Sequence, residues 1–315
     1  MCRISVITSL YNSQDYLDGY FAAVEGISNK DELEILMIHN APNEQELKII
    51  NALLPSYPFI KHIVVGREGL YATWNRGINL SSGDYITVWN VDDVHLPDSL
   101  KHQADGLDAH PEAALAYGDF TIVKKYGDTE GFAVNEPQFS ASNPSFFRQH
   151  HIGCFPMWRR TVHETIGFFD EQFRLIADLD FQIRIAKAYG LVKIPQQLGY
   201  YLEGTPGNLS SNAKLQDLEH TLLHLRYGNF GHLYLTHFFE TFKKFKIFEY
   251  KWFGEFHKIP DRSGTENRAY WSRMPLLLFS IAKLPRHIAR KHFKAYFYKI
   301  FPARRSGDDL NTSTV

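Results

Sequence analysis

The sequence predicts an α/β protein in which a mostly parallel sheet is flanked by helices and followed by a helical, basic C-terminal extension. Three observations lead to this prediction. Within residues 1–120, short β-rich runs alternate with segments that have helical spacing. Such alternation is typical of a parallel sheet that is covered by helices on both faces. Basic residues then dominate from residue 241 to residue 305.

The first part of the chain alternates in a regular order. Expected strands cover Arg3–Ser9, Leu33–Ile38, Ile60–Val65, Tyr85–Trp89 and Ala113–Tyr117, and expected helices cover Asp15–Glu25, Asn43–Leu54, Leu70–Leu80 and the segment from Pro97 to Ala109. Ligands of such sheets bind beyond the carboxyl ends of the strands. The polar residues at those ends are therefore the first candidates for a functional site.

The second part has a weaker pattern. Residues 120–155 contain scattered Gly, Pro, Asn and Ser, and we expect loops and short strands that form a pocket wall. Further on, we expect helices at Thr161–Ile166, Asp178–Tyr189, Ala213–Arg226 and Leu233–Phe248, a strand at Val192–Ile194, and a linker at 255–268.

Composition fits a globular protein. Of the 315 residues, 44% are hydrophobic and 22% are charged, which excludes disorder, collagen and coiled coil for the whole chain. The two cysteines, Cys2 and Cys154, indicate a reducing compartment, most simply the cytoplasm. We expect no secretory signal, because the chain starts directly on a strand-like run. We expect no membrane span, because no run reaches about 18 apolar residues.

The net charge of −1 averages two opposite ends of the chain. Residues 1–110 carry seven basic and fifteen acidic side chains, whereas residues 241–305 carry sixteen basic and four acidic ones. A chain polarised in this way often has two tasks, and its basic end often meets something anionic.

Two adjacent carboxylates, Asp92 and Asp93, follow the strand expected at Tyr85–Trp89. Neighbouring carboxylates repel each other unless a cation or hydrogen-bond donors compensate their charge. At the end of a strand they suit a hard divalent cation that also takes phosphate oxygens. The alternative is an Asp-rich turn that caps the next helix.

Residues 3 to about 212 resemble the family 2 glycosyltransferases, which have the GT-A fold. The resemblance is carried by segments in matching order, namely Ser5–Asn12, Gly69–Gly77, Ser82–Ile86, Asn90–Asp93, Gly153–Arg160, Ile166–Asp170 and Ala177–Arg184. The first ends in a Tyr-Asn pair, the second contains Asn-Arg-Gly, and the fourth stands where the family has its metal-binding DxD motif. The last resembles the region of the catalytic base. Each segment alone is a weak signal, but their order and spacing together are specific.

The resemblance implies a nucleotide-sugar donor, with a UDP-sugar as the favoured one. Thr8, Tyr11 and Asn12 would border the nucleotide base. Arg76 would face the nucleotide or its phosphates, with a plain surface charge of its helix as the equal alternative.

The resemblance also implies the chemistry. Asp92 would hold the ribose or the metal shell, and Asp93 would ligate Mg²⁺ or Mn²⁺, which stabilises the leaving diphosphate. Asp178 would be the general base that takes the proton of the acceptor hydroxyl, and a single displacement would invert the anomeric carbon. The alternative for Asp178 is a helix N-cap, and the two roles can coexist. Asp180 would orient the helix or pair with Arg184.

The sequence departs from the family pattern at three places. The aspartate that usually contacts the base is replaced by His39 or Asn40, so the nucleotide preference stays open. The first DxD position is the neutral Asn90, and Thr205 stands near the place of an expected histidine. These changes permit an enzyme with weakened activity or with less dependence on a metal ion.

The resulting expectation is a hexosyltransferase-type, metal-dependent enzyme that acts in cell-surface polysaccharide or lipid-linked glycan synthesis. We expect a GT-A domain at residues 1–228, with a nucleotide-sugar half at 1–118 and an acceptor half at 119–228. The helical, basic extension at 229–315 would end in a disordered tail. A second interpretation is a catalytically degenerate GT-A domain that binds a glycan or acts as a scaffold. A nucleotidyltransferase would be expected to carry a glycine-rich, basic phosphate loop near the first strand, which Thr8–Ser13 is not.

Other candidate residues favour structural roles. His220 and His224 are four residues apart, but no HExxH pattern accompanies them, so exposed helix histidines are expected. Cys154 has no catalytic signature and is expected to pack.

The segment 270–305 combines basic residues with an aromatic and aliphatic face. This pattern predicts contact with an anionic membrane, at the inner face of the plasma membrane, or a helix that packs on the catalytic domain with Lys and Arg stems along its surface. No nucleic-acid partner is expected, because no nucleic-acid-binding signature is present.

Overall fold

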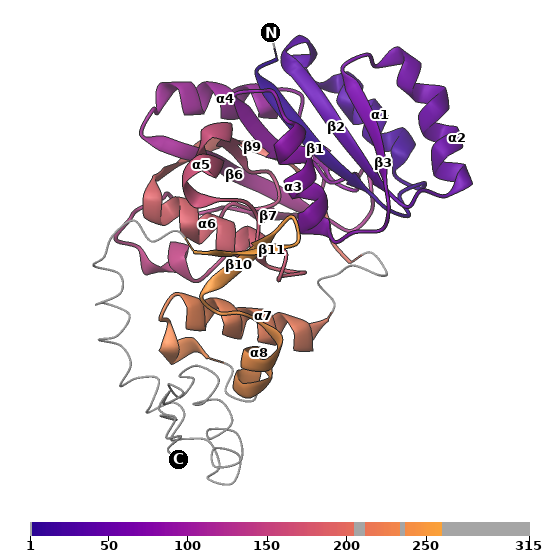
Figure 1. Ribbon diagram of the computed structural model, residues 1–315. Coiled ribbons are helices and arrows are strands. Elements are labelled where there is room, and N and C mark those ends of the chain that lie inside the picture. Colours follow the sequence, from indigo (N-terminus) through magenta and orange to yellow (C-terminus); the bar gives the residue numbers. More distant parts are fainter. Residues whose placement is uncertain (1, 205–211, 234–236, 260–315) are drawn as a thin grey trace, which may run out of the picture.

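The computed structural model describes residues 2–204, 212–233 and 237–259, and its α/β architecture confirms the predicted fold class (Figure 1). Within these residues a nine-stranded sheet has the strand order β3-β2-β1-β4-β8-β6-β9-β5, with β7 paired to β6. Helices lie against both faces of this sheet. Of the helical, basic extension predicted at 229–315, the segment 270–305 lies outside the described residues, and so does Thr205.

The strands fall into a parallel half and a mixed half. The first half is β3-β2-β1-β4, entirely parallel, with β1 at Ile4–Leu10, β2 at Leu33–Asn40, β3 at Ile60–Val65 and β4 at Tyr85–Val88. The second half pairs β6 (Ala113–Val123) in parallel with β9 (Gly190–Leu202) and adds antiparallel β5 (Val94–His95), β7 (Phe132–Val134) and β8 (Met157–Arg159). Strand β8, which joins the two halves, was not predicted, because three residues give no periodicity.

The α-helices of the described residues are α1 (Leu17–Gly26), α2 (Glu44–Leu53), α3 (Leu70–Leu80), α4 (Ser99–Ala109), α5 (His163–Ile166), α6 (Ala177–Ala188), α7 (Ala213–Arg226) and α8 (Phe238–Lys244). In the first half of the fold, helices α1 to α4 match the predicted ones closely. The predicted helix Leu233–Phe248 is wrong at its C-terminal end, since α8 ends at Lys244, and residues 234–236 of that prediction lie outside the described residues. The predicted linker at 255–268 is wrong at its start, because β10 (Glu249–Trp252) and β11 (Glu255–Lys258) form a hairpin there.

Close packing of α3 on β1 aligns the first half. A Cβ atom on Gly77 would lie only 2.6 Å from Cγ2 of Ile7, so glycine at this position lets the helix approach the strand. The same helix is tied to the second half through Asn75. Its amide nitrogen donates to the carbonyl of Phe169 (2.9 Å) and to the Glu171 carboxylate (3.0 Å), and its oxygen accepts from the Phe169 N–H (2.9 Å).

A buried ionic cluster ties α6, α7 and the hairpin together. The Arg226 guanidinium donates to Asp180 and to Asp170, at 2.8 Å each, and to the carbonyl of Glu249. Arg184 also donates to Asp180 (2.9 Å), as the spacing predicted. Burial opposes ionisation of Asp180, but the two guanidinium charges hold its pKa below the usual value. The domain boundary at residue 228 stays a prediction, and the hydrogen bond from Arg226 to the carbonyl of Glu249 crosses it.

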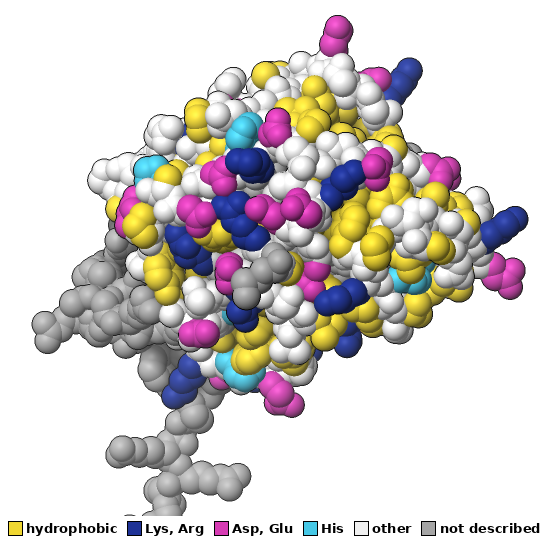
Figure 2. Space-filling model, turned by 90° about the horizontal axis from the view of Figure 1, so that it is seen from above, with side chains coloured by type: hydrophobic (Ala, Val, Ile, Leu, Met, Phe, Trp, Pro, Cys, Tyr) yellow, Lys and Arg dark blue, Asp and Glu magenta, His cyan; other side chains and the backbone are white. Residues whose placement is uncertain are grey.

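The surface near the N-terminus and α4 carries intermixed charges. On this face, seen from above in Figure 2, basic and acidic side chains alternate rather than segregate. Arg3 accounts for part of this mixing, because it bonds Glu32, Asp105 and Asp108. Among the described residues, no helix has the length and apolar character needed to cross a membrane.

Candidate functional site

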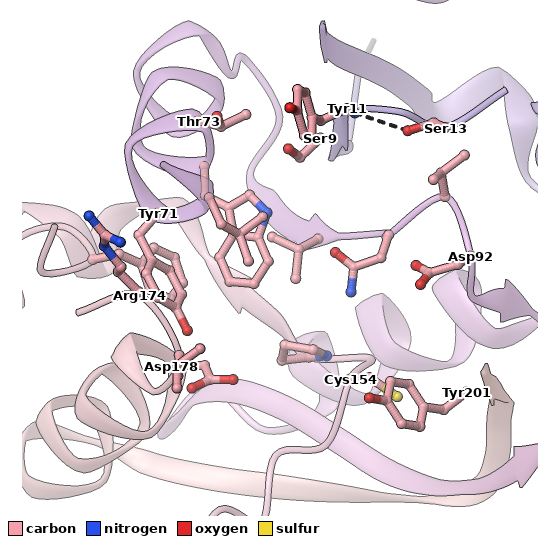
Figure 3. Close-up of a pocket in the computed structure, with 18 of the residues that line it drawn as sticks. Ser9, Tyr11, Ser13, Tyr71, Thr73, Asp92, Cys154, Arg174, Asp178 and Tyr201 are labelled. Carbon is pink, nitrogen blue, oxygen red and sulfur yellow. Dashed lines mark hydrogen bonds between the residues drawn. The ribbon is translucent and has the colours of Figure 1, made fainter. Parts of the chain in front are cut away.

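A cleft of about 990 Å³ lies beyond the carboxyl ends of β1, β2 and β4, as the parallel sheet predicts. Figure 3 shows residues of its two ends. We call them the Tyr11 end and the Asp178 end. Ser9, Tyr11, Ser13 and Asp92 lie towards the first, and Tyr71, Arg174 and Asp178 lie at the second. Contacts add Arg67 on the Tyr11 ring and Asn40 bonded to Thr73 to the first end, and Phe169 on the Tyr71 ring and His150 beside Asp178 to the second.

The Tyr11 end offers a flat aromatic surface. Tyr11 is 45% exposed, and the Arg67 guanidinium lies 3.4 Å from the centre of its ring. Asn12, directly after Tyr11, has a φ of 52°, a left-handed conformation that turns the chain away from β1. Asn40 lines the same end, where its amide donates to Thr73 (3.0 Å) and its oxygen accepts from the N–H of Glu68 (3.1 Å).

Three residues predicted for the nucleotide site do not line the cleft. Thr8 is fully buried, and its hydroxyl bonds that of Tyr20 (2.7 Å). His39 is also buried, with Nδ1 3.0 Å from His62, because neighbouring residues of a strand point to opposite faces and Asn40 takes the cleft side. Arg76 forms a two-pronged ion pair with Glu68 (2.8 and 3.1 Å). Their nucleotide roles stay predictions.

Asp92 and Asp93 occupy different depths. Asp92 lines the cleft, whereas Asp93 is only 1% exposed and accepts from the Asn90 amide (3.1 Å) and the N–H of Leu202 (3.4 Å). Burial raises the pKa of Asp92, and burial together with the Asp92 charge raises the pKa of Asp93 well above its usual value. A cation would relieve this repulsion, so the pair fits a metal ion with Asp92 as the residue on the cleft side.

The pair is nevertheless a sparse metal site. In the part of the chain that the structure describes, no group of three or more His, Cys, Asp or Glu side chains is arranged to hold a metal ion. A cation here would depend on the two aspartates and on oxygens from a ligand, which is the way Mg²⁺ is often held.

Asp178 stands at the opposite end, in the first turn of α6. One carboxylate oxygen accepts from the N–H of Leu179 (2.8 Å), and the other lies 3.5 Å from Nε2 of His150. Gln182, one turn further along α6, fixes the segment that carries His150. Its amide donates to the carbonyls of Phe146 and Gln149, and its oxygen accepts from two N–H groups of residues 151 and 152.

Several residues that line the cleft were not predicted from the sequence. Arg67 follows β3 at the same sheet edge as Tyr11, so the strand-end rule could have found it. His150, Arg174 and Tyr201 come from loops or from a strand of the second half, where no sequence pattern pointed to the cleft.

Comparison with known proteins identifies the class. The sequence model of "Glycosyl transferase family 2" matches residues 5–167, just over half of the chain, and the chain therefore belongs to this family. A relative from Mycobacterium tuberculosis named "PGL/p-HBAD biosynthesis glycosyltransferase" is 25% identical over 157 residues, which cover 49% of this chain and 58% of that protein. The match thus spans less than two thirds of the relative.

Two further comparisons agree with the family. An uncharacterised glycosyltransferase of Bacillus subtilis, YwdF, is 25% identical over 200 residues, covering 61% of this chain and 71% of that protein. Among solved structures, residues 1–349 of TarS from S. aureus, in complex with UDP-GlcNAc, superpose with a TM-score of 0.60 at 14% identity. That superposition covers 99% of this chain and 94% of the TarS chain, and the GT-A-like fold is confirmed.

Proposed function

We propose that this chain is an inverting glycosyltransferase that moves a sugar from a UDP-sugar to an acceptor hydroxyl. The observation that carries the proposal is a single cleft with Tyr11 and Asp92 towards one end and Asp178 at the other, in a chain of glycosyl transferase family 2. The TarS complex supports a UDP-sugar donor, because that protein of similar fold was solved with UDP-GlcNAc.

The donor nucleotide would bind at the Tyr11 end. The Tyr11 ring and the Arg67 guanidinium provide flat faces on which a base can stack. Asn40 adds amide groups that suit the edge of a base, although their present partners are Thr73 and Glu68. An amide can bond several bases, so this end accounts for base binding better than for base selection.

A divalent cation, Mg²⁺ or Mn²⁺, would be held by Asp92, with Asp93 behind it. When bound, it would supply positive charge that stabilises the leaving diphosphate. The protein's own contribution is the buried carboxylate pair, in which burial raises the pKa of both groups and the Asp92 charge raises that of Asp93 further.

Asp178 would act as the general base. Its carboxylate lies in the cleft and can take the proton of an acceptor hydroxyl as that hydroxyl attacks the sugar. Asp180 is unsuited to this task, since it is buried and bonded to Arg184 and Arg226. One attacking hydroxyl and one base give a single displacement, which inverts the anomeric centre.

The test compares Asp178→Asn with Asp217→Asn. Asp217 is a matched control because it also lies 3.5 Å from a histidine, His237, and its side chain is 37% exposed against 33% for Asp178. UDP-, GDP-, dTDP- and CMP-sugars are screened for thermal stabilisation and for slow hydrolysis. We expect Asp178→Asn to bind the donor normally and to lose transfer by about 10²–10⁴-fold, whereas Asp217→Asn keeps both.

The possible outcomes separate the two interpretations of the family resemblance. Unchanged transfer in Asp178→Asn removes this residue from the mechanism. Donor binding without any turnover in the unchanged protein would favour a catalytically degenerate domain that binds glycans or acts as a scaffold. The neutral Asn90 at the start of the DxD region and His39 favour this alternative, whereas Asp92, Asp93 and Asp178 together argue against it.

We further propose a cytoplasmic enzyme that acts on a cell-surface or lipid-linked glycan and contacts an anionic membrane through residues 270–305. The support is the excess of basic residues from 241 to 305. The full chain should sediment with vesicles that contain anionic lipid, and deletion of 270–315 should abolish this. Failure of the full chain to sediment would refute the membrane contact.

A further inference from the structure

Arg174 is a cationic side chain at the Asp178 end of the cleft, and it is exposed there. In the close-up it lies beside Tyr71, on the same side of the cleft as Asp178 (Figure 3). Within the described residues its guanidinium makes no hydrogen bond or ion pair, although Asp178 is only four residues away. The Asp178 carboxylate instead accepts a hydrogen bond from the N–H of Leu179 and lies next to His150.

The backbone that carries Arg174 is held rigidly by a buried acid on α7. The Glu219 carboxylate is inaccessible to solvent and accepts hydrogen bonds from the N–H groups of Arg174 (2.8 Å), Leu175 (2.9 Å) and Ile176 (3.2 Å). Three bonds from one carboxylate fix the path of the chain into α6. The attachment point of the Arg174 side chain is therefore preorganised relative to Asp178.

The other arginine of the cleft has partners at the opposite end. Arg67 stacks on Tyr11 and donates to the carbonyl of Glu68 (3.3 Å). Arg174 thus provides positive charge at the Asp178 end, and its five N–H donors are free for a ligand. A guanidinium is the side chain best suited to two-pronged recognition of phosphate or carboxylate oxygens.

We propose that Arg174 binds an oxyanion on the acceptor, so that the acceptor substrate carries a phosphate or carboxylate group close to the hydroxyl that is glycosylated. This inference rests on the proposed function, because it takes the Asp178 end as the acceptor side. The bound oxyanion would hold the acceptor while Asp178 takes the proton of its hydroxyl. Arg174 would then set acceptor specificity without contributing to donor binding.

The first experiment measures binding alone, with the full chain saturated with UDP. Glycerol is compared with glycerol 1-phosphate, and glucose with glucuronate, by isothermal titration. We expect each charged compound to bind at least tenfold more tightly than its neutral partner. Arg174→Gln should remove the difference, and Arg174→Lys should keep part of it. Lys48→Gln, which removes an exposed charge on α2, should change nothing.

The second experiment measures release of UDP from the donor sugar with the same compounds as acceptors. Arg174→Gln should raise KM for the charged acceptors at least tenfold and leave the donor KM and the acceptor-free hydrolysis unchanged. Equal binding of charged and neutral compounds by the unchanged protein would overturn the inference. A raised donor KM in Arg174→Gln would also overturn it, since Arg174 would then bind the donor phosphates.

The two experiments keep this inference apart from the proposed function. If no nucleotide sugar is turned over but charged compounds still bind in an Arg174-dependent way, glycosyl transfer fails and the oxyanion site stands. If turnover depends on Asp178 but acceptor charge has no effect, transfer stands and the oxyanion site fails. The phosphate and carboxylate arms also reveal which oxyanion is preferred.

Discussion

Asn75 on α3 bonds both backbone polar groups of Phe169, with both bonds at 2.9 Å. Asn75 is buried, and Phe169 lines the Asp178 end of the cleft. One side chain from the parallel half of the fold thus fixes the backbone of the opposite half. This contact positions Phe169 in the cleft lining, and the sequence pattern Asn-Arg-Gly does not reveal it.

Asn75→Ala should destabilise the protein, because it leaves the N–H and the carbonyl of Phe169 without partners. We expect a loss of about 2–4 kcal/mol in the free energy of unfolding. The neighbouring Arg76→Ala breaks only a surface ion pair with Glu68 and should cost at most about 1 kcal/mol. Urea denaturation of both variants measures the difference, and equal losses would contradict it.

The variant Arg76→Ala also tests the predicted nucleotide role of Arg76. Its ion pair with Glu68 and its place outside the cleft lining indicate that Arg76→Ala should bind UDP as the unchanged protein does. A weakening of UDP binding by tenfold or more in this variant would restore Arg76 to the nucleotide site.

Metal addition should act through Asp92. Because the Asp92 and Asp93 charges repel each other in a buried place, Mn²⁺ with UDP should raise the melting temperature of the unchanged protein more than UDP alone. Asp92→Asn should lose this extra stabilisation and keep the effect of UDP. Scanning calorimetry with and without a chelator measures both. A full Mn²⁺ effect in Asp92→Asn would locate the cation elsewhere.

Sequence periodicity was sufficient for the parallel half of the fold. Strands β1 to β3 and helix α3 have the hydrophobic spacing that defines their type, and the strand-end rule pointed to Asp92. Tyr11 and Asn40 were implied by the family resemblance, and both line the cleft as well. The sequence pattern could not decide whether His39 or Asn40 lines the cleft, because both follow the same predicted strand. Only the alternation of side chains along that strand decides which one faces the cleft.

The Asp178 end was harder to predict because its residues are placed by side chains far away in sequence. Gln182 holds the segment with His150, and Glu219 holds the backbone of Arg174. Neither Gln182 nor Glu219 differs in sequence from an ordinary polar helix residue. The short strands β8, β10 and β11 were missed for a related reason, since three or four residues carry no readable period.

Acid should weaken the hydrogen bonds and the ion pair that the Glu34 carboxylate on β2 accepts. Its carboxylate accepts from Ser5 (2.6 Å), Lys61 (2.7 Å) and both the N–H and the hydroxyl of Ser82. Burial opposes ionisation, but these donors lower the pKa of Glu34 from 4.5 to about 2. A lowered pKa stabilises the fold above pH 4.5, and this stabilisation is lost as the pH falls towards 2.

Glu34→Gln should therefore cost about 3 kcal/mol at neutral pH. The deficit relative to the unchanged protein should shrink between pH 4.5 and pH 2. Denaturation across this pH range measures it, with the exposed Glu164→Gln on α5 as the control. A deficit that stays constant with pH would show that the carboxylate charge is not what stabilises this site.

Removal of the Arg226 charge should be the most damaging single change among these. Arg226→Met leaves Asp170 without its guanidinium partner and Asp180 with the Arg184 guanidinium and the Tyr227 hydroxyl, inside a region closed to solvent. Breaking a buried ion pair from one side typically costs about 3–5 kcal/mol. The exposed pair Lys214–Glu240 provides the control, and Lys214→Ala should cost at most about 1 kcal/mol.

Because Arg226 also donates to the carbonyls of Ile247 and Glu249, its loss should increase hydrogen exchange in the β10–β11 hairpin. Unaltered exchange there would mean that the hairpin is held by its other contacts.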